Sequence, residues 1–218
     1  MKQLKIYCIS DTHQRHRELT DRLNDGGDIL IHAGDFTNYG GRFSQKVGGI
    51  DDFNEWLGTL PFKHKVLIFG NHERVLSEDK DVTKIKQRFS NATYLNDECV
   101  EIDGLKVFGS SWKVDHGNNR DRLWATVPIG AHIVVTHNPP DGKQEAIDID
   151  KSLMRRILQV KPVLTIFGHI HVDYGVWERD GVTFVNAAMM NDHQKTLNDP
   201  IGFRLEITDD KTVKLDRL

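Results

Sequence analysis

The stretch Val163-Leu164-Thr165-Ile166-Phe167-Gly168-His169-Ile170-His171 joins a mainly apolar run to a glycine and two histidines. The apolar run predicts a buried strand, and the glycine permits a sharp turn where that strand ends. Two histidines two residues apart, just beyond a strand, can both point at one site above a sheet. Such a pair also occurs in surface loops and in cores, so its meaning depends on what the other strands carry.

Four earlier strand-like runs also end in polar residues. We predict these strands at Leu4–Ile9, Asp28–Ala33, Lys65–Phe69 and His132–Thr136. The residues that follow or close them are Asp11-Thr12-His13, Gly34-Asp35, Gly70-Asn71-His72-Glu73 and His137. In an α/β chain with continuous apolar strands, ligands bind at the carboxyl ends of the strands. The recurrence therefore predicts one polar cluster built from five strand ends.

The composition restricts the classes of protein and partner. The 218 residues include 29 Lys and Arg against 32 Asp and Glu, which gives a formal net charge of −3. This charge gives no general attraction to nucleic acid or to an anionic membrane, so we expect neither as a partner. No apolar run approaches the roughly 20 residues that cross a bilayer. Cys8 and Cys99 make no disulfide framework, and no signal peptide precedes the first strand. We expect a cytoplasmic protein.

Helices and hairpins are predicted between and after these strands. The helices are expected at about 15–23, 50–57, 79–89, 120–126 and 150–160, and the further short strands at 93–95, 100–102, 105–109, 175–177, 183–185, 203–207 and 212–215. Asp103-Gly104 is a predicted hairpin turn, and the glycines at 40–41 and 48–49 indicate a flexible loop. Because no repeat or linker is found, we expect one domain over residues 1–218, an α/β fold in which helices cover two β-sheets.

The residue types of the cluster indicate a metal site. The candidate ligands are Asp11, His13, Asp35, Asn71, His137, His169 and His171. Imidazole and carboxylate without thiolate suit Mn, Fe or Zn better than Ca or Mg. Seven ligands are too many for one tetrahedral ion and suit two ions that share a carboxylate, for which Asp35 is the natural choice. Two-metal sites activate water and clamp the attacking and leaving oxygens of a phosphoester, so the sequence predicts phosphoester hydrolysis.

His72 is assigned a separate role. Since Asn71 can serve as a neutral ligand, His72 remains free to face the substrate and to donate a proton to the leaving alkoxide. The alternatives that His72 is a further ligand or a packing residue stay open. The catalytic candidates are therefore Asp35, Asn71 and His72. Most of the histidines outside the strand-end motifs, His32 among them, are expected to be ordinary surface or packing residues.

The ordered set of strand-end motifs resembles the calcineurin-like metallophosphoesterase superfamily. Ala33-Gly34-Asp35-Phe36-Thr37, Thr136-His137-Asn138-Pro139-Pro140 and Tyr174-Gly175 resemble more narrowly its metallophosphoesterase-domain-containing phosphodiesterase subgroup. The resemblance implies a four-layer α-β-β-α sandwich of two mixed sheets and a dinuclear centre. One metal would be held by Asp11, His13, Asp35 and His171, and the other by Asp35, Asn71, His137 and His169.

The resemblance also implies an activity. A metal-bridging hydroxide would attack a phosphodiester of the small or cyclic nucleotide type, with His72 as the general acid. Mn is the favoured metal, with Fe, Zn or Mg as alternatives. A phosphomonoesterase remains a competing function, because the same metals cleave either ester. A scaffold that keeps the metal site and binds a nucleotide with little turnover is the non-catalytic alternative.

Two positions depart from the family pattern. Many members carry a second Asp three residues after the bridging one, where it orients the catalytic histidine, and this chain has Asn38 there. Asn138 stands where the family motif has Gly. We expect this amide either to narrow the backbone approach near the second metal or to add a hydrogen-bonding group to the pocket.

Overall fold

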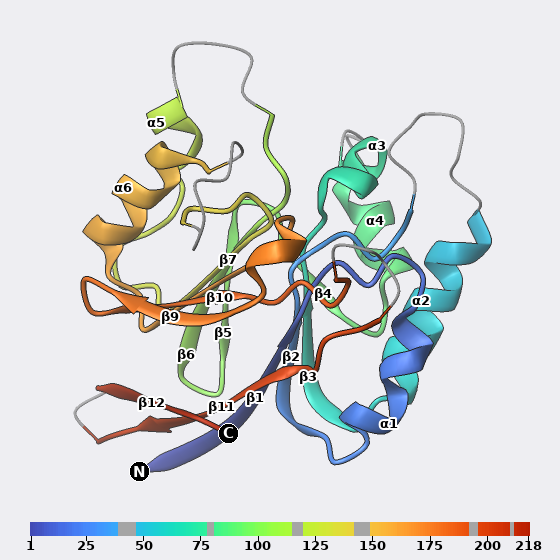
Figure 1. Ribbon diagram of the computed structural model, residues 1–218, viewed down its shortest axis with the longest axis horizontal. Coiled ribbons are helices and arrows are strands. Elements are labelled where there is room, and N and C mark those ends of the chain that lie inside the picture. The colour runs from blue at the N-terminus through green and yellow to red at the C-terminus, as the bar shows by residue number, and fades with distance from the viewer. Residues whose placement is uncertain (39–46, 78–80, 115–119, 142–148, 192–195, 210–211) are drawn as a thin grey trace.

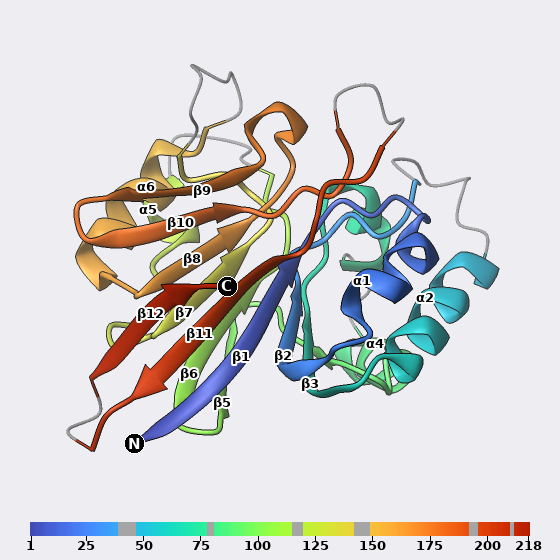
Figure 2. The same cartoon turned by 60° about the horizontal axis from the view of Figure 1, so that its bottom comes forward.

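The computed structural model describes residues 1–38, 47–77, 81–114, 120–141, 149–191, 196–209 and 212–218. Two six-stranded sheets pack face to face, and helices cover part of the outer side of each (Figures 1 and 2). This is the predicted four-layer arrangement. The order of the layers is one group of helices, the first sheet, the second sheet and the other group of helices.

The first sheet carries the N-terminal strands. Its order is β12 (Val213–Arg217), β11 (Ile201–Ile207), β1 (Lys2–Ile9), β2 (Gly27–His32), β3 (Phe62–Leu67) and β4 (Thr93–Tyr94). The run from β1 to β4 is parallel, whereas β11 is antiparallel to both β1 and β12. The carboxyl ends of β1, β2 and β3 therefore lie at the same edge.

The second sheet has the same mixed character. Its order is β5 (Glu98–Ile102), β6 (Leu105–Ser110), β7 (Ile133–Thr136), β8 (Leu164–Phe167), β10 (Val182–Asn186) and β9 (Gly175–Arg179). The four inner strands are parallel. At the two edges, β5 pairs antiparallel with β6 and β9 pairs antiparallel with β10. A parallel bridge between Ser10 and Ala188 links the chain that leaves β1 to the chain that leaves β10.

Three apolar cores hold the layers together. Between the sheets, the inward side chains of both, such as Ile6, Ile133 and Ile166, are fully buried. Phe53 and Trp56 of helix α2 (Val47–Thr59) belong to the core outside the first sheet. Leu153 and Ile157 of helix α6 (Lys151–Val160) belong to the core outside the second. Because the central strands β7 and β8 are buried on both faces, their sequences are mainly apolar.

The helices range from single turns of four residues to the 13 residues of α2. They are α1 (Thr20–Leu23), preceded by a 3₁₀ turn at His16–Leu19, α2 (Val47–Thr59), α3 (Arg74–Ser77), α4 (Val82–Arg88), α5 (Arg120–Leu123) and α6 (Lys151–Val160). α1, α2 and α4 lie over the first sheet, and α5 and α6 lie over the second (Figure 1).

Several local predictions need correction. Gly48-Gly49 lies inside α2 and not in a loop. The buried Ile50, Phe53 and Trp56 that follow stabilise the helix enough to offset the low helix propensity of glycine. The helix expected at 15–23 divides into a 3₁₀ turn and one α-helical turn. β3 begins and ends earlier than predicted. The loop residues 39–41 lie outside the described residues.

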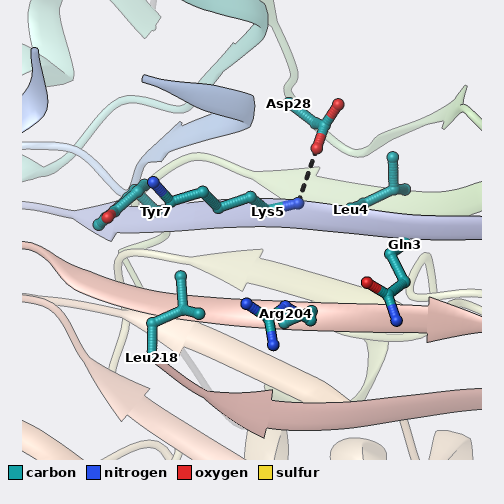
Figure 3. A pocket seen from close by; sticks show the side chains of 7 residues that line it. All are labelled: Gln3, Leu4, Lys5, Tyr7, Asp28, Arg204 and Leu218. Carbon is teal, nitrogen blue, oxygen red and sulfur yellow. Dashed lines mark hydrogen bonds between the residues drawn. The ribbon is translucent and has the colours of Figure 1, made fainter. Parts of the chain in front are cut away.

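None of the described helices contributes to the surface that β1 and β11 form around Lys5 and Arg204. Gln3, Lys5 and Tyr7 face outward from β1, and Arg204 lies beside them on β11 (Figure 3). They line a shallow hollow of about 440 Å³, into which Asp28 also points and accepts a hydrogen bond from the backbone N–H of Lys5 at 2.7 Å. The hollow contains none of the candidate metal ligands.

The start of α6 gives a test of the fold. One carboxylate oxygen of Asp150 accepts from the backbone N–H groups of Ser152 and Leu153 at 3.0 and 3.1 Å, and the other accepts from Trp124 Nε1 at 2.8 Å. Asp150→Ala removes the helix cap and also leaves the indole N–H of the fully buried Trp124 unpaired. We expect it to lower the free energy of unfolding by about 2–3 kcal/mol, measured by urea denaturation.

Asp81→Ala is the matched control. Asp81 caps α4 by accepting from Lys84 N at 3.2 Å and is exposed, so its loss should cost only about 0.5–1 kcal/mol. Equal losses for the two variants would contradict the structural role assigned to Asp150.

Candidate metal centre

Five strand ends deliver the predicted residues to one place between the sheets. Asp11 follows β1, Asp35 follows β2, Asn71 and His72 follow β3, His137 follows β7, and His169 and His171 follow β8. Backbone hydrogen bonds tie the first two turns together, from Asp11 N to Gly34 O at 2.9 Å and from His13 N to Asp35 O at 3.1 Å. The backbone N–H of His169 donates to the Asp11 carboxylate at 3.0 and 3.1 Å, which joins the two sheets.

Four of these residues have a left-handed backbone. The φ angles are 51° at Asp11, 42° at His13, 56° at Asp35 and 71° at His169. This conformation is uncommon outside glycine, although Asp, Asn and His tolerate it best, and it costs about 1–3 kcal/mol per residue. The sharp turns bring side chains on the same edge of the sandwich to face one another.

The donor atoms gather into three overlapping groups. They are Asp11 with His13 and His171, Asp35 with His137 and His169, and His13 with Asp35 and His72. Within each group the donor atoms lie within 4.8 Å of one another. Asn71 joins the second group, because its Oδ1 lies 3.1 Å from His137 Nε2 and 2.9 Å from His169 Nδ1. All seven predicted ligands and His72 are therefore brought together.

Backbone carbonyls orient two of the imidazoles. His137 Nδ1 lies 2.7 Å from Ala33 O, and His13 Nδ1 lies 3.0 Å from Thr37 O. Because a carbonyl only accepts, each Nδ1 carries the hydrogen, and each Nε2 faces the cluster with its lone pair when the ring is neutral. Metal-binding histidines are commonly held in this way by a second hydrogen bond.

Buried negative charge makes the cluster a site for cations. Asp11 and Asp35 are 0% and 2% exposed. Burial alone would raise the pKa of each carboxyl group, but the surrounding imidazoles, chiefly His137, outweigh it and hold both values below the usual range. Burial would lower the pKa of His137, but the charges of Asp35 and Asp11 raise it to about 10. These residues can hold a divalent metal in place of the protons.

Glu73 holds the turns in place without facing the cluster. Its Oε2 accepts from Asp35 N and Gly70 N at 2.8 and 2.9 Å, and its Oε1 accepts from Thr37 N and Thr37 Oγ1 at 2.8 and 2.7 Å. Burial, followed by the charge of Asp35, raises the pKa of Glu73 to about 7 despite these donors. One buried carboxylate thereby fixes the turn after β2 to the turn after β3. From the sequence, Glu73 is open to holding either a backbone group or an imidazole, and the structure shows it holding three backbone N–H groups and the Thr37 hydroxyl.

His32 is the supporting residue that sequence reasoning missed. It is buried, its Nε2 lies 3.0 Å from Thr12 Oγ1, and its Nδ1 accepts from Gly34 N at 3.2 Å. Burial lowers its pKa to about 3, so the ring is neutral. His32 is thus more than the ordinary packing residue expected from the sequence, because it supports the turns that carry Asp11 and Asp35. Its place inside a strand gives no signal of this.

His72 lies at the rim of the cluster. Its side chain is 29% exposed, its Nε2 is 3.9 Å from Asp35 Oδ2, and its ring packs edge-on against His13 at 4.8 Å between centroids. Among the described residues, its Nδ1 has no hydrogen-bond partner. Asn38, at the position where many family members carry the Asp that orients this histidine, donates from Nδ2 to His13 O at 3.1 Å. The backbone N–H of His72 donates to Asp35 Oδ1 at 2.8 Å, which fixes its position.

Trp112 forms one side of the cluster. Its ring centroid is 4.6 Å from that of His169 and 5.7 Å from that of His137. Its place after a predicted strand suits either rim packing or a base-stacking platform, and the structure shows it packed against the imidazoles of His169 and His137. Further polar residues that follow Trp112 in the sequence and are candidates to line a pocket lie outside the described residues, namely His116, Asn118 and Asn119.

Residues 4–173 match the family model described as calcineurin-like phosphoesterase. The chain belongs to this family. Among curated proteins it is 33% identical to the UPF0046 protein C25E10.12 of Caenorhabditis elegans, over 96% of this chain and 84% of the relative. It is 32% identical to human metallophosphoesterase domain-containing protein 1, over 90% and 69% of the two chains. Among solved structures, TT1561 of Thermus thermophilus superposes with a TM-score of 0.62 at 11% identity, over 99% of each chain.

Glu73→Gln tests the buried carboxylate of this calcineurin-like phosphoesterase. The substitution turns one acceptor into an NH₂ group that faces two donors, so two of the four hydrogen bonds are lost. We expect the free energy of unfolding, measured by urea denaturation, to fall by about 3 kcal/mol. We expect the affinity for Mn²⁺, measured by calorimetry, to fall about tenfold. Glu101→Gln, at an exposed position of β5, is the control. An unchanged free energy of unfolding in Glu73→Gln would contradict the assignment of Glu73 as the residue that holds the turns after β2 and β3.

Proton release tests the charge balance of the cluster. His137 and His171 have raised pKa values because the buried Asp carboxylates outweigh the effect of burial, so a bound metal must displace their protons. We expect Mn²⁺ affinity to rise between about pH 6 and pH 8. Calorimetry in buffers of different ionisation enthalpy measures the protons released. Affinity that falls with rising pH, or no proton release, would contradict this balance.

Proposed function

We propose that this chain is a phosphodiesterase with a dinuclear metal centre. Asp11, His13, Asp35 and His171 would hold one metal, and Asp35, Asn71, His137 and His169 the other. The support is the grouping of donor atoms, in which Asp35 and His13 each belong to two groups. Mn is the favoured metal, with Fe, Zn or Mg as alternatives, because the donors are nitrogen and oxygen without a thiolate. Bound metals would supply water activation and neutralise the negative charge of the phosphoryl group.

The exposure of the His72 side chain at the rim of the cluster is the observation that carries the proposal. Its ring is more accessible than three other imidazoles of the donor groups, at 29% exposed against 0%, 5% and 19% for His137, His13 and His171. A fully buried imidazole cannot reach a leaving group, whereas one at the rim of the cluster can. We assign His72 as the general acid that donates a proton to the leaving oxygen of the ester.

The proposed substrate is a small phosphodiester of the nucleotide or cyclic nucleotide type. The net charge of −3 disfavours the multiple phosphate contacts that hold an extended nucleic acid. The half-buried indole of Trp112 at one side of the cluster provides an apolar surface beside the charged centre. Both features favour a compact ester with an apolar group.

Hydrolysis of nitrophenyl esters with added Mn²⁺ tests the function. We expect bis(p-nitrophenyl) phosphate to be cleaved faster than p-nitrophenyl phosphate, and 2′,3′- or 3′,5′-cyclic nucleotides to be cleaved as well. Asp35→Asn, which removes the carboxylate shared by two groups, should reduce kcat by about 10³-fold or more. Faster cleavage of the monoester would indicate a phosphomonoesterase. Tight nucleotide binding without turnover would indicate a metal-dependent scaffold.

The role of His72 is tested by varying the leaving group. Nitrophenolate is a weak base and leaves without much help, whereas the alkoxide released from a cyclic nucleotide needs a proton. His72→Ala should therefore reduce kcat for the cyclic nucleotide by about 10²–10⁴-fold and reduce that for the nitrophenyl diester much less. His64→Ala, on β3 and outside all three donor groups, is the control. Equal losses for both substrates would exclude the acid role.

A reducing, cytoplasmic location is part of the proposal. Cys8 is buried and Cys99 exposed, and both are free thiols, which supports a reducing environment. None of the helices in the described ranges combines the length and the apolar character of a membrane span.

A further inference from the structure

Trp112 is held on the cluster by its backbone and by its neighbour. Its N–H donates to Phe69 O at 2.8 Å, which ties it to the turn that precedes Asn71. The next residue, Lys113, makes two backbone hydrogen bonds to one side chain: its N–H donates to Asn138 Oδ1 at 2.9 Å, and its carbonyl accepts from Asn138 Nδ2 at 3.0 Å. The chain on both sides of the indole is therefore anchored.

The Asn138 amide continues a β-ladder beyond its last strand residues. The parallel pairing of β6 with β7 ends at Ser110 and Thr136. Two residues after Thr136, the side chain of Asn138 offers one acceptor and one donor to the backbone of Lys113, as a further strand residue would. An amide side chain can do this because it carries the same two groups as a peptide unit.

Asn138 itself has little freedom to move. It is buried, and its carbonyl accepts from Thr136 Oγ1 at 2.8 Å, a bond that spans His137. On the other side, Lys113 Nζ lies 2.6 Å from Asp97 Oδ1 and 2.7 Å from Leu123 O. The contact between Asn138 and Lys113 is thus a fixed link between β7 and the segment that carries Trp112.

We infer that Asn138 is a positioning residue that holds the indole of Trp112 against the imidazoles of His169 and His137. It acts through the Lys113 backbone. The indole limits rotation of the His169 ring and keeps water from its flank, so that the ring stays directed at Asn71 Oδ1. The inference rests on the proposed function only in that these imidazoles are taken to hold a metal.

Fluorescence of the metal-free protein tests the link from Asn138 to Trp112. The emission of Trp112 is obtained by subtracting the spectrum of Trp112→Phe from that of the wild type. For Asn138→Ala, the Trp112 emission is obtained in the same way, by subtracting the spectrum of the double variant Asn138→Ala/Trp112→Phe. We expect the Trp112 emission of Asn138→Ala to lie at longer wavelength than that of the wild type and to be quenched more strongly by acrylamide. Asn138→Asp keeps the acceptor for Lys113 N and should give a smaller shift, and it also serves if the alanine variant does not fold.

A matched control removes a similar set of contacts elsewhere. Asn54 Oδ1 accepts from Asn91 N at 3.1 Å, and Asn54 Nδ2 donates to Ser90 Oγ at 3.3 Å. Asn54→Ala, in α2, should leave the Trp112 emission unchanged. Equal shifts in Asn54→Ala and Asn138→Ala, or no shift in Asn138→Ala, would overturn the inference.

Mn²⁺ binding tests the link from Trp112 to the imidazoles, without use of activity. We expect Asn138→Ala and Trp112→Phe each to weaken Mn²⁺ binding about tenfold, and the double variant to bind no more weakly than the weaker single variant. This non-additivity is the signature of two residues that act through one contact. Additive losses, or undiminished binding in Asn138→Ala, would overturn the inference.

The two proposals fail in different ways. If the wild type binds Mn²⁺ but hydrolyses no phosphodiester, the proposed function fails, whereas both tests of Asn138 retain their meaning. If the wild type binds no divalent metal, the dinuclear centre and the metal-dependent part of the inference are both overturned. The position of Trp112 is then judged by the fluorescence result alone.

Discussion

Two carboxylates buried between two sheets determine how this part of the molecule is built. Asp11 and Asp35 are almost fully out of water and are surrounded by imidazoles whose donor atoms point at them. Isolated buried carboxylates would cost many kcal/mol or take up protons. The cluster therefore requires positive charge, from protonated imidazole or from metal cations. The raised pKa of His137, beside both carboxylates, is the physical sign of that requirement.

The unfavourable features of the cluster are offset by hydrogen bonds around it. Left-handed backbone at four of the ligand positions persists only where neighbouring structure fixes it. Glu73 binds the turns after β2 and β3, and His32 supports the turns after β1 and β2. Each of these side chains is buried and each satisfies backbone groups that would otherwise lie unpaired. Supporting residues of this kind determine where the candidate ligand side chains point.

Both sheets contribute to the cluster, and the contact between them is therefore part of the site. The His169 N–H donates to Asp11 across the sheets, and Asn138 joins β7 to the segment that follows β6. The apolar core between the sheets fixes their distance, since close-packed interiors move little without a large cost. The fold and the site are consequently coupled through the same strand ends.

Most of the strands, the two-sheet architecture and the residues of the cluster were predictable from the sequence. Continuous apolar runs that end in Asp, Asn or His carry a local signal, because burial on both faces removes polar residues from a strand and the turn beyond it restores them. The sequence was less informative about pairing. β4 pairs in parallel with β3, and β11 returns to the first sheet beside β1, because pairing depends on which strands meet in three dimensions and not on local composition.

The amino-acid sequence by itself determined which side chains are candidates for the chemistry, since residue type and position at a strand end are local properties. Only the tertiary structure decided how they are held. Glu73 and the Asn138 amide accept hydrogen bonds from backbone groups 38 and 25 residues away. His32 contacts the backbone N–H of Gly34 and the side-chain hydroxyl of Thr12. Backbone groups are the same in every residue, so no sequence pattern marks their partners. Those partners are fixed when the sheets pack and bring the turns together.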